Sequence, residues 1–216
     1  MRIRLLVALL LALACLGQPA RADEFNPAGL AADSRAYAQS LTSRFPAGGS
    51  PLARRAAEDR AAAALARKDW PAAAAALEAR VALGEASADD WLALARAQLR
   101  RVPAEPQKAL AAGWQAFQAV DSGPPEIPAL LLMAEALRAL HRDAQAVQAL
   151  EAVVQRDSAN PAYQRALADA RRAAGMLVRQ VRTEGEADPP RACIDFTVPP
   201  RRGAGFNPQD WVRLDP

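Results

Sequence analysis

The feature that most restricts the fold of this 216-residue chain is a recurrence of about 34 residues in its central part. Each recurrence carries two amphipathic helical patterns joined by a short polar turn. A unit of this size cannot bury its apolar face alone, so successive units must stack side by side. Composition agrees, because 51% of the residues are hydrophobic but only 5% are aromatic, which favours helix faces built from alanine and leucine over a β-sandwich core.

The clearest unit runs from residue 127 to residue 159. Leu130 and Ala134 share one face of its first helix, and Ala146 and Leu150 share one face of its second helix. Two helices approach closely only where both carry small side chains, so the two alanines are expected at the crossing point. This arrangement resembles the tetratricopeptide repeat, with small residues at the two crossing positions and a bulky apolar residue after the second.

Further units match the same pattern less completely. One begins near Ala88, with Trp91 in its first helix and Gly113 in its second, and a less regular one begins near Arg54. A single helix from Pro161 is expected to close the stack. The residues expected to pack the repeats are Ala95, Ala109, Ala134, Ala146, Leu150 and Ala168.

The sequence pattern changes after Gly175. Residues 176–183 are rich in β-branched side chains, and Ile194 and Phe196 alternate with Cys193 and Asp195, which predicts two strands. An isolated hairpin is only marginally stable in water. We therefore expect a mainly α chain, a tetratricopeptide-like α-hairpin solenoid followed by a short, incomplete β segment. The expected divisions are a signal peptide (1–22), an N-terminal helix and linker (23–50), the helical repeats (51–175) and the β segment (176–216).

Residues 190–197 (PRACIDFT) and 206–216 (FNPQDWVRLDP) resemble the opening of the first macroglobulin-like domain in bacterial alpha-2-macroglobulin family proteins. The resemblance covers only the front end of that architecture. It implies a large envelope protein that traps proteases after cleavage of a bait region, in some members with a thioester. Neither a thioester motif at Cys193 nor a bait region is found here. The interpretation is therefore a fragment of a longer protein or the product of an interrupted gene.

The first 22 residues have the layout of a secretory signal: Arg2 and Arg4, an apolar run over 5–16, and a small-x-small triplet ending at Ala22. The run is too short to cross a membrane, which takes about 20 residues, so we expect cleavage after Ala22 and no integral span. The alternative is a lipoprotein with lipid at Cys15. Either way the chain is expected to be exported, to the periplasm or the cell envelope.

The net charge of +3 belongs to this N-terminal segment. Loss of Arg2, Arg4 and Arg21 lowers the 27 basic residues to 24, which equals the 24 acidic residues. A neutral chain does not supply the field that nonspecific binding to phosphates requires, so no nucleic-acid partner is expected.

No pattern of catalytic or metal-binding residues is found. His141, the single histidine, is predicted in a solvated turn without the partners of a triad or a metal site. Cys193, the one cysteine left after cleavage, is expected to be buried in a strand and inert. Residues 184–188 are acidic but lack the alternating ligand spacing of a calcium loop. We expect no cofactor, no metal and no enzymatic activity.

Stacked helical hairpins form an extended groove that suits a protein partner. Geometry suggests Trp91, Gln98, Leu130 and Arg138 as its lining. The leading interpretation is a non-catalytic, exported protein-binding scaffold at the head of an alpha-2-macroglobulin-like protease inhibitor. The alternative is a stand-alone periplasmic tetratricopeptide-repeat adaptor in envelope assembly. The sequence indicates neither the identity of the partner nor the oligomeric state.

Overall fold

The computed structural model describes residues 25–45, 50–175, 178–184 and 191–196. The helices are α2 (Leu30–Arg44), α3 (Pro51–Ala66), α4 (Trp70–Ala82), α5 (Ala88–Arg100), α6 (Pro106–Gln118), the 3-10 helix η1 (Pro124–Glu126), α7 (Ile127–Ala139), α8 (Asp143–Arg156) and α9 (Pro161–Ala174). Two strands follow, β1 (Val178–Glu184) and β2 (Arg191–Phe196). The expected signal peptide and residues 197–216 lie outside the described residues.

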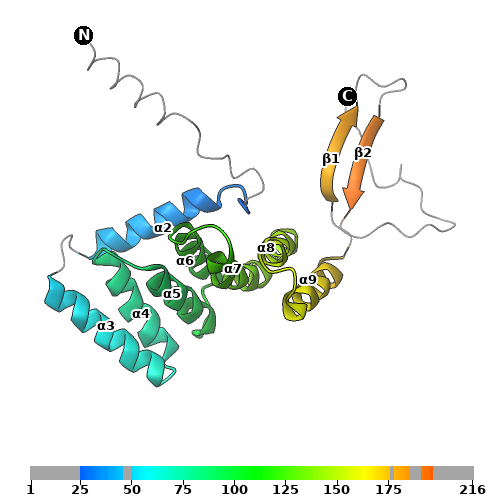
Figure 1. Ribbon diagram of the computed structural model, residues 1–216. Coiled ribbons are helices and arrows are strands. Elements are labelled where there is room, and N and C mark those ends of the chain that lie inside the picture. Colours follow the sequence, from blue (N-terminus) through cyan, green and yellow to red (C-terminus); the bar gives the residue numbers. More distant parts are fainter. Residues whose placement is uncertain (1–24, 46–49, 176–177, 185–190, 197–216) are drawn as a thin grey trace, which may run out of the picture.

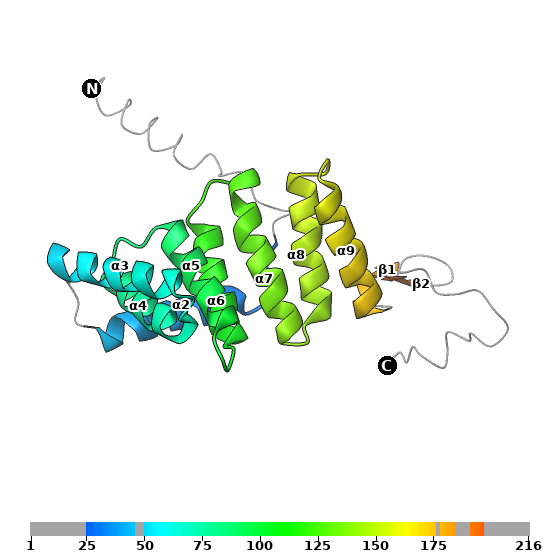
Figure 2. The same ribbon diagram turned by 90° about the horizontal axis from the view of Figure 1, so that it is seen from below.

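The helices from α3 onward form a row in which each packs against its neighbours in the chain, as Figures 1 and 2 show. Three helical hairpins, α3–α4, α5–α6 and α7–α8, stack one after another, and α9 packs on α8. The prediction of a mainly α stack of helical hairpins followed by a short β segment is confirmed.

Local sequence signals set where these helices begin. Ser87 and Asp90 form a reciprocal capping box at the start of α5, where each side chain accepts a hydrogen bond from the other residue's backbone N–H. The side chains of Ser50, Asp69 and Asn160 cap α3, α4 and α9 by accepting one backbone N–H each, from Ala53, Ala72 and Ala162. Proline stands in the first turn of five of the described α-helices, where its missing N–H costs nothing.

Small side chains make up much of the buried core between the helices. Five of the six residues expected to pack the repeats are buried: Ala95, Ala109, Ala134, Ala146 and Leu150. Ala168 is the exception and is exposed, while Leu167 and Ala170 of the same helix are buried. In the hairpins the first helix packs against the second helix that follows it, whereas the described residues contain no helix after α9. The stack therefore ends on a helix with an exposed outer face.

At Gly113, helices α6 and α7 lie too close together to leave room for a side chain. A Cβ atom at this position would lie 2.8 Å from Cγ of Met133 on α7 and 3.8 Å from the carbonyl oxygen of Ala129. Glycine in a helix interior costs about 1 kcal/mol relative to alanine. Glycine is nevertheless required at this position because Met133 of the neighbouring helix occupies the space that a side chain would need.

Helix α2 does not continue the row but lies across α4 and α6, the second helices of the first two hairpins (Figure 1). The Ser34 hydroxyl donates to the carbonyl oxygen of Ala111 (2.7 Å) and accepts from the Gln115 amide (2.9 Å). Ahead of the helix, the Phe25 ring contacts the rings of Trp114 and Phe117, with centroids 6.4 and 6.5 Å apart. Hydrogen bonds from α2, and aromatic packing of the residue Phe25 ahead of it, thus join this part of the chain to α6.

Arg80 lies in α4 where the repeat pattern favours a small apolar residue, and its side chain is largely buried. The guanidinium forms ion pairs with Glu58 of α3 (2.8 Å) and Asp90 of α5 (3.2 Å). It also donates to the carbonyl oxygen of Gly84 (3.2 Å) in the following turn. The irregular first hairpin is thus joined to the second by a polar contact in place of an apolar one.

The two strands form an antiparallel hairpin beyond the end of α9 (Figure 1). Ile194 pairs with Val181, and Phe196 pairs with Val178. Cys193 lies in β2 as expected, but it is half-buried and free rather than buried.

We predict that Gly113→Ala lowers the free energy of unfolding by about 1–2 kcal/mol, since the cost of overpacking against Met133 exceeds the gain in helix propensity. Chemical denaturation followed by circular dichroism measures the change. In a Met133→Ala background the same substitution should be neutral or stabilising, because the obstructing side chain is gone. A stabilised Gly113→Ala single variant would contradict the close approach.

Candidate functional site

The structure places the four residues expected to line a groove in different environments. Gln98 and Leu130 have no exposed surface and Trp91 is 9% exposed, so these side chains pack inside the stack and cannot meet a partner. They are therefore corrected to packing residues. On the first helices of their hairpins, these three side chains face the neighbouring helices and not the solvent. Arg138 alone is exposed.

Arg138 lies in a hollow of about 800 Å³ between α7, α8 and α9. Helices α7 and α9 supply most of its lining, and α8 contributes Asp143 and Leu150 between them. Its apolar lining consists of Leu131, Ala134, Ala139, Leu150, Ala166 and Ala173. The hollow thus lies between α7, the first helix of the third hairpin, and α9, which takes the place of the next first helix, and this is the side on which stacked repeats create a groove.

The charged side chains of the hollow are Glu135, Arg138, Asp143 and Asp169. Asp169 forms an ion pair with Arg172 on the same helix. Within the described residues, the side chains of Glu135, Arg138 and Asp143 form no ion pair or hydrogen bond with another group. Charges of both signs are therefore available to an incoming ligand beside a small apolar surface.

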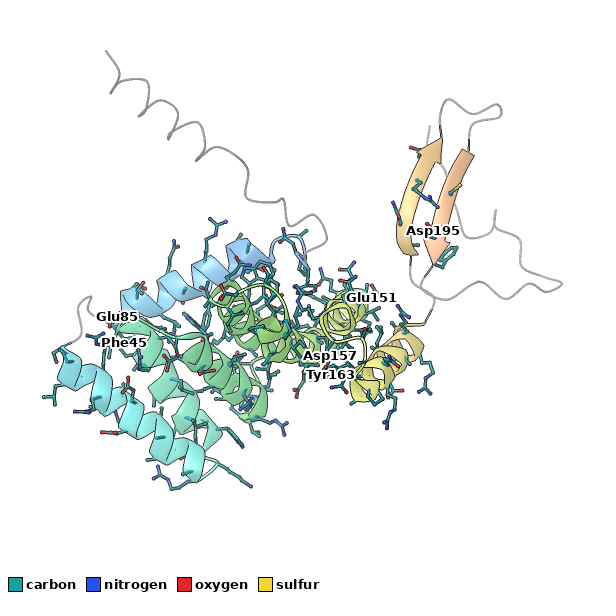
Figure 3. All side chains as sticks on the ribbon, viewed as in Figure 1. Phe45, Glu85, Glu151, Asp157, Tyr163 and Asp195 are labelled. Atoms are coloured by element: carbon teal, nitrogen blue, oxygen red, sulfur yellow. The ribbon has the colours of Figure 1, made fainter. Side chains whose placement is uncertain are left out.

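The position of α9 determines the width of this hollow. Leu167 and Ala170 are buried against the stack, and the Arg171 guanidinium forms an ion pair with Glu151 of α8 at 2.7 Å. Figure 3 labels Glu151 and Tyr163, and Tyr163 packs partly buried against the core. These contacts hold α9 against α8, so that the hollow lies between α9 and α7.

A second hollow of about 430 Å³ lies at the start of α3, lined by Pro51, Leu52, Arg54, Arg55, Glu58, Arg80 and Glu85. Most of its charges are already paired within the protein: Arg54 pairs with Glu85, and Arg80 with Glu58. A ligand would have to compete with these ion pairs. The hollow at Arg138 is therefore the better candidate for a binding site.

Sequence reasoning named Arg138 but missed Glu135, Asp143 and Asp169. Glu135 and Arg138 stand three residues apart on an otherwise apolar helix, a spacing that places them on one face. This signal could have identified the pair. Nothing in the sequence shows that α9 lies close enough to bring Asp169 to the same hollow.

Gln98 instead belongs to a buried polar network that joins three helices. Its amide donates to Oε1 of Glu78 on α4 (2.9 Å), and the Tyr37 hydroxyl of α2 donates to the same oxygen (3.1 Å). Arg44 of α2 lies 3.3 Å from the second oxygen, but its side chain is half exposed, so this pair contributes little. Burial, and then the neighbouring Glu78 carboxylate, raise the pKa of Tyr37 above its usual value.

The described residues include no group of three or more histidine, cysteine, aspartate or glutamate side chains that could hold a metal ion. His141 lies exposed in the turn between α7 and α8, with a φ of 56° that places it in the left-handed region. Among the described helices, none has the length and apolar character needed to cross a membrane.

Comparison with known proteins finds similarity to a solved helical-repeat structure but to no sequence family. No family model matches the sequence, and no curated protein matches it. A solved structure described as "Arabidopsis OM64 TPR domain", where TPR denotes the tetratricopeptide repeat, aligns with a TM-score of 0.48 at 20% identity. The alignment covers 56% of this chain and 97% of that chain. At this level of similarity the match assigns no function.

We predict that the fold loses stability above about pH 10, where tyrosine ionises in unfolded chains. The folded state keeps Tyr37 protonated because its pKa is raised, so the unfolded state alone releases this proton as the pH increases. The contribution of Tyr37 to the free energy of unfolding is therefore complete below about pH 10 and falls by about 1.4 kcal/mol per pH unit above it.

The sequence contains two tyrosines, so the Tyr163→Phe variant leaves Tyr37 as the only chromophore of its kind. In this variant, tyrosinate absorbance should appear together with the loss of helical circular dichroism. Tyrosinate that forms near pH 10 while the helices remain intact would contradict the burial of Tyr37. Tyr37→Phe serves as the control, since it should lose the additional pH dependence.

Proposed function

We propose that the helical stack is a non-catalytic protein-binding module and that the hollow between α7, α8 and α9 is its binding surface. The observation that carries this proposal is a set of charges of both signs that have no partner among the described residues, the exposed Glu135 and Arg138 and the half-buried Asp143, beside an apolar lining. A protein segment can offer both side chains of opposite charge and apolar side chains to such a surface.

The dimensions of the hollow suit a short segment of a partner rather than a large globular surface. Its volume of about 800 Å³ is within the usual range for ligand pockets. It is open to one side, and its rigid helical walls are joined by the Arg171–Glu151 ion pair. A bound segment would therefore meet a preformed site and would not have to order it.

At a finer level, we propose that the module is exported and forms the N-terminal part of an alpha-2-macroglobulin-like protease inhibitor. Its support is the signal-like pattern of residues 1–22 and the resemblance of residues 190–197 and 206–216 to the start of a macroglobulin-like domain. In such a protein the helical stack would position the inhibitor at the envelope or recruit a partner to it.

The alternative is a stand-alone periplasmic adaptor in envelope assembly, which the neutral charge of residues 23–216 and the groove geometry fit equally well. A protease challenge separates the two. Only an inhibitor of the macroglobulin type, assayed as the product isolated from its source cells, would retain a cleaved protease in a stable complex.

A photo-crosslinking residue at the hollow tests the binding surface. Ala139 is exposed in the hollow, and a benzoylphenylalanine in its place should crosslink to a partner protein in extracts of the source cells. The same replacement at Ala32, which is exposed on α2, is the matched control and should not. Equal crosslinking from both positions would count against the hollow.

With the purified partner, we predict that Arg138→Glu weakens binding by about tenfold or more, because it replaces the only cation of the hollow that has no partner within the described residues. Arg35→Glu on α2 carries the same change of charge at an exposed site away from the hollow and should leave the affinity unchanged. Circular dichroism should show that both variants remain helical. Equal affinities of the two variants would refute the role of Arg138.

Export has its own test. Peptide sequencing of the protein isolated from the cell envelope should find Asp23 as the first residue, which corresponds to cleavage after Ala22. A lipid-modified N-terminal Cys15 would support the lipoprotein alternative, and a protein that retains Met1 in the cytosol would contradict export.

A further inference from the structure

The β1–β2 hairpin has one apolar face and one polar face. Residues directly opposite in an antiparallel pair lie on the same side of the sheet. Val181 opposes Ile194 and Val178 opposes Phe196, so each valine shares its side with an aliphatic or aromatic partner. Gln180 opposes Asp195 and Arg182 opposes Cys193 on the other side, where Arg182 forms an ion pair with Asp195 at 3.1 Å. Figure 3 labels Asp195 on the hairpin.

A β-bulge is responsible for this separation. Val178 and Val181 are three residues apart and would point to opposite faces of a regular strand. Between Val178 and Gln180 the register shifts: these residues are two positions apart in β1, whereas their partners Phe196 and Asp195 are adjacent in β2. The extra residue returns Val178 to the face of Val181. All four apolar residues of the two pairs, Val178, Val181, Ile194 and Phe196, therefore lie on one side, which we call the apolar face of the hairpin.

The described residues leave this apolar face open. Val178 is 55% exposed and Val181 is 57% exposed, although both belong to paired positions in the sheet. The hairpin stands beyond the end of α9 in both ribbon views (Figures 1 and 2). Two strands alone are marginally stable, and a contiguous exposed apolar surface in a folded protein usually meets a partner.

We propose that residues 197–216 of the same chain cover the apolar face of the hairpin. This segment follows Phe196 directly and contains Phe206, Trp211, Val212 and Leu214. Its 20 residues can span roughly 65 Å when extended, whereas a six-residue strand is about 20 Å long, so the segment can return along the whole face. Its apolar residues lie far enough from Phe196 to allow the chain to reverse before they reach the valines.

Covering by a neighbouring segment also has the smallest entropic cost. The connection from Phe196 to Trp211 is short, so closing this loop costs less than bringing in a distant part of the chain. The other apolar segment outside the described residues, residues 5–16, lies more than 150 positions away from the hairpin and is expected to be removed with the signal.

Photo-crosslinking within the full chain tests this proposal. A benzoylphenylalanine in place of Val181 should form an intramolecular crosslink to a peptide within residues 206–214, identified by mass spectrometry. The same residue in place of Gln180, the adjacent exposed position on the opposite face, is the matched control and should form none to that peptide. Crosslinks from Val181 to residues 1–24, to the helices, to a second copy or to another protein would each overturn the proposal, as would equal crosslinking from both positions.

Amide hydrogen exchange supplies a second readout that does not depend on a modified hairpin. Trp211→Ala should accelerate exchange of the β1 and β2 amides at least tenfold, while exchange in α3–α8 stays unchanged. Trp211→Phe retains a large apolar side chain and should remain near the wild-type rate. Unchanged exchange of the strand amides in Trp211→Ala would overturn the role of this residue as a cover.

Discussion

The close approach of helices at small side chains is the constraint on which the rest of this structure depends. Gly113 leaves no room for a Cβ beside Met133, and Ala134 and Ala146 are both buried in the α7–α8 hairpin. Helices that pack this closely bury much surface through many weak contacts. The stack can therefore be built with few aromatic residues, and its geometry follows from where the alanines and the glycine lie.

Contacts between small apolar side chains do little to fix how the helices are oriented relative to one another. In this protein, buried polar groups with specific hydrogen-bond partners help to fix that arrangement. Glu78 accepts hydrogen bonds from helices α2 and α5. Glu126, which has no exposed surface, pairs with Arg156 of α8 and accepts the backbone N–H of Gly123 at 3.1 Å. A buried carboxylate without partners is strongly destabilising, so each of these groups requires the correct arrangement of neighbouring elements.

The two ends of the stack differ in what they present to other molecules. At the start, α2 lies across α4 and α6, and the charges around Arg80 are paired with one another. At the other end, α9 packs on α8 and borders a hollow with unpaired charges, and the hairpin that follows has an apolar face that no other described residue is shown to cover. Both surfaces thus lie in the C-terminal part of the described chain, although they differ in chemistry: the hollow is charged and suits a partner, whereas the hairpin face is apolar and suits a segment of the same chain.

The sequence by itself determined the helical repeat architecture and the two strands, because these depend on periodicity and on contacts within a few residues. It also identified four of the buried alanines, Ala95, Ala109, Ala134 and Ala146, and the exposed Arg138. Only the tertiary structure decided that Gln98 and Leu130 face inward, that Ala168 remains exposed, and that Asp169 joins Glu135 in one hollow. These outcomes depend on which helix lies opposite each residue and on the bulge that turns Val178, and such long-range geometry is not contained in local periodicity.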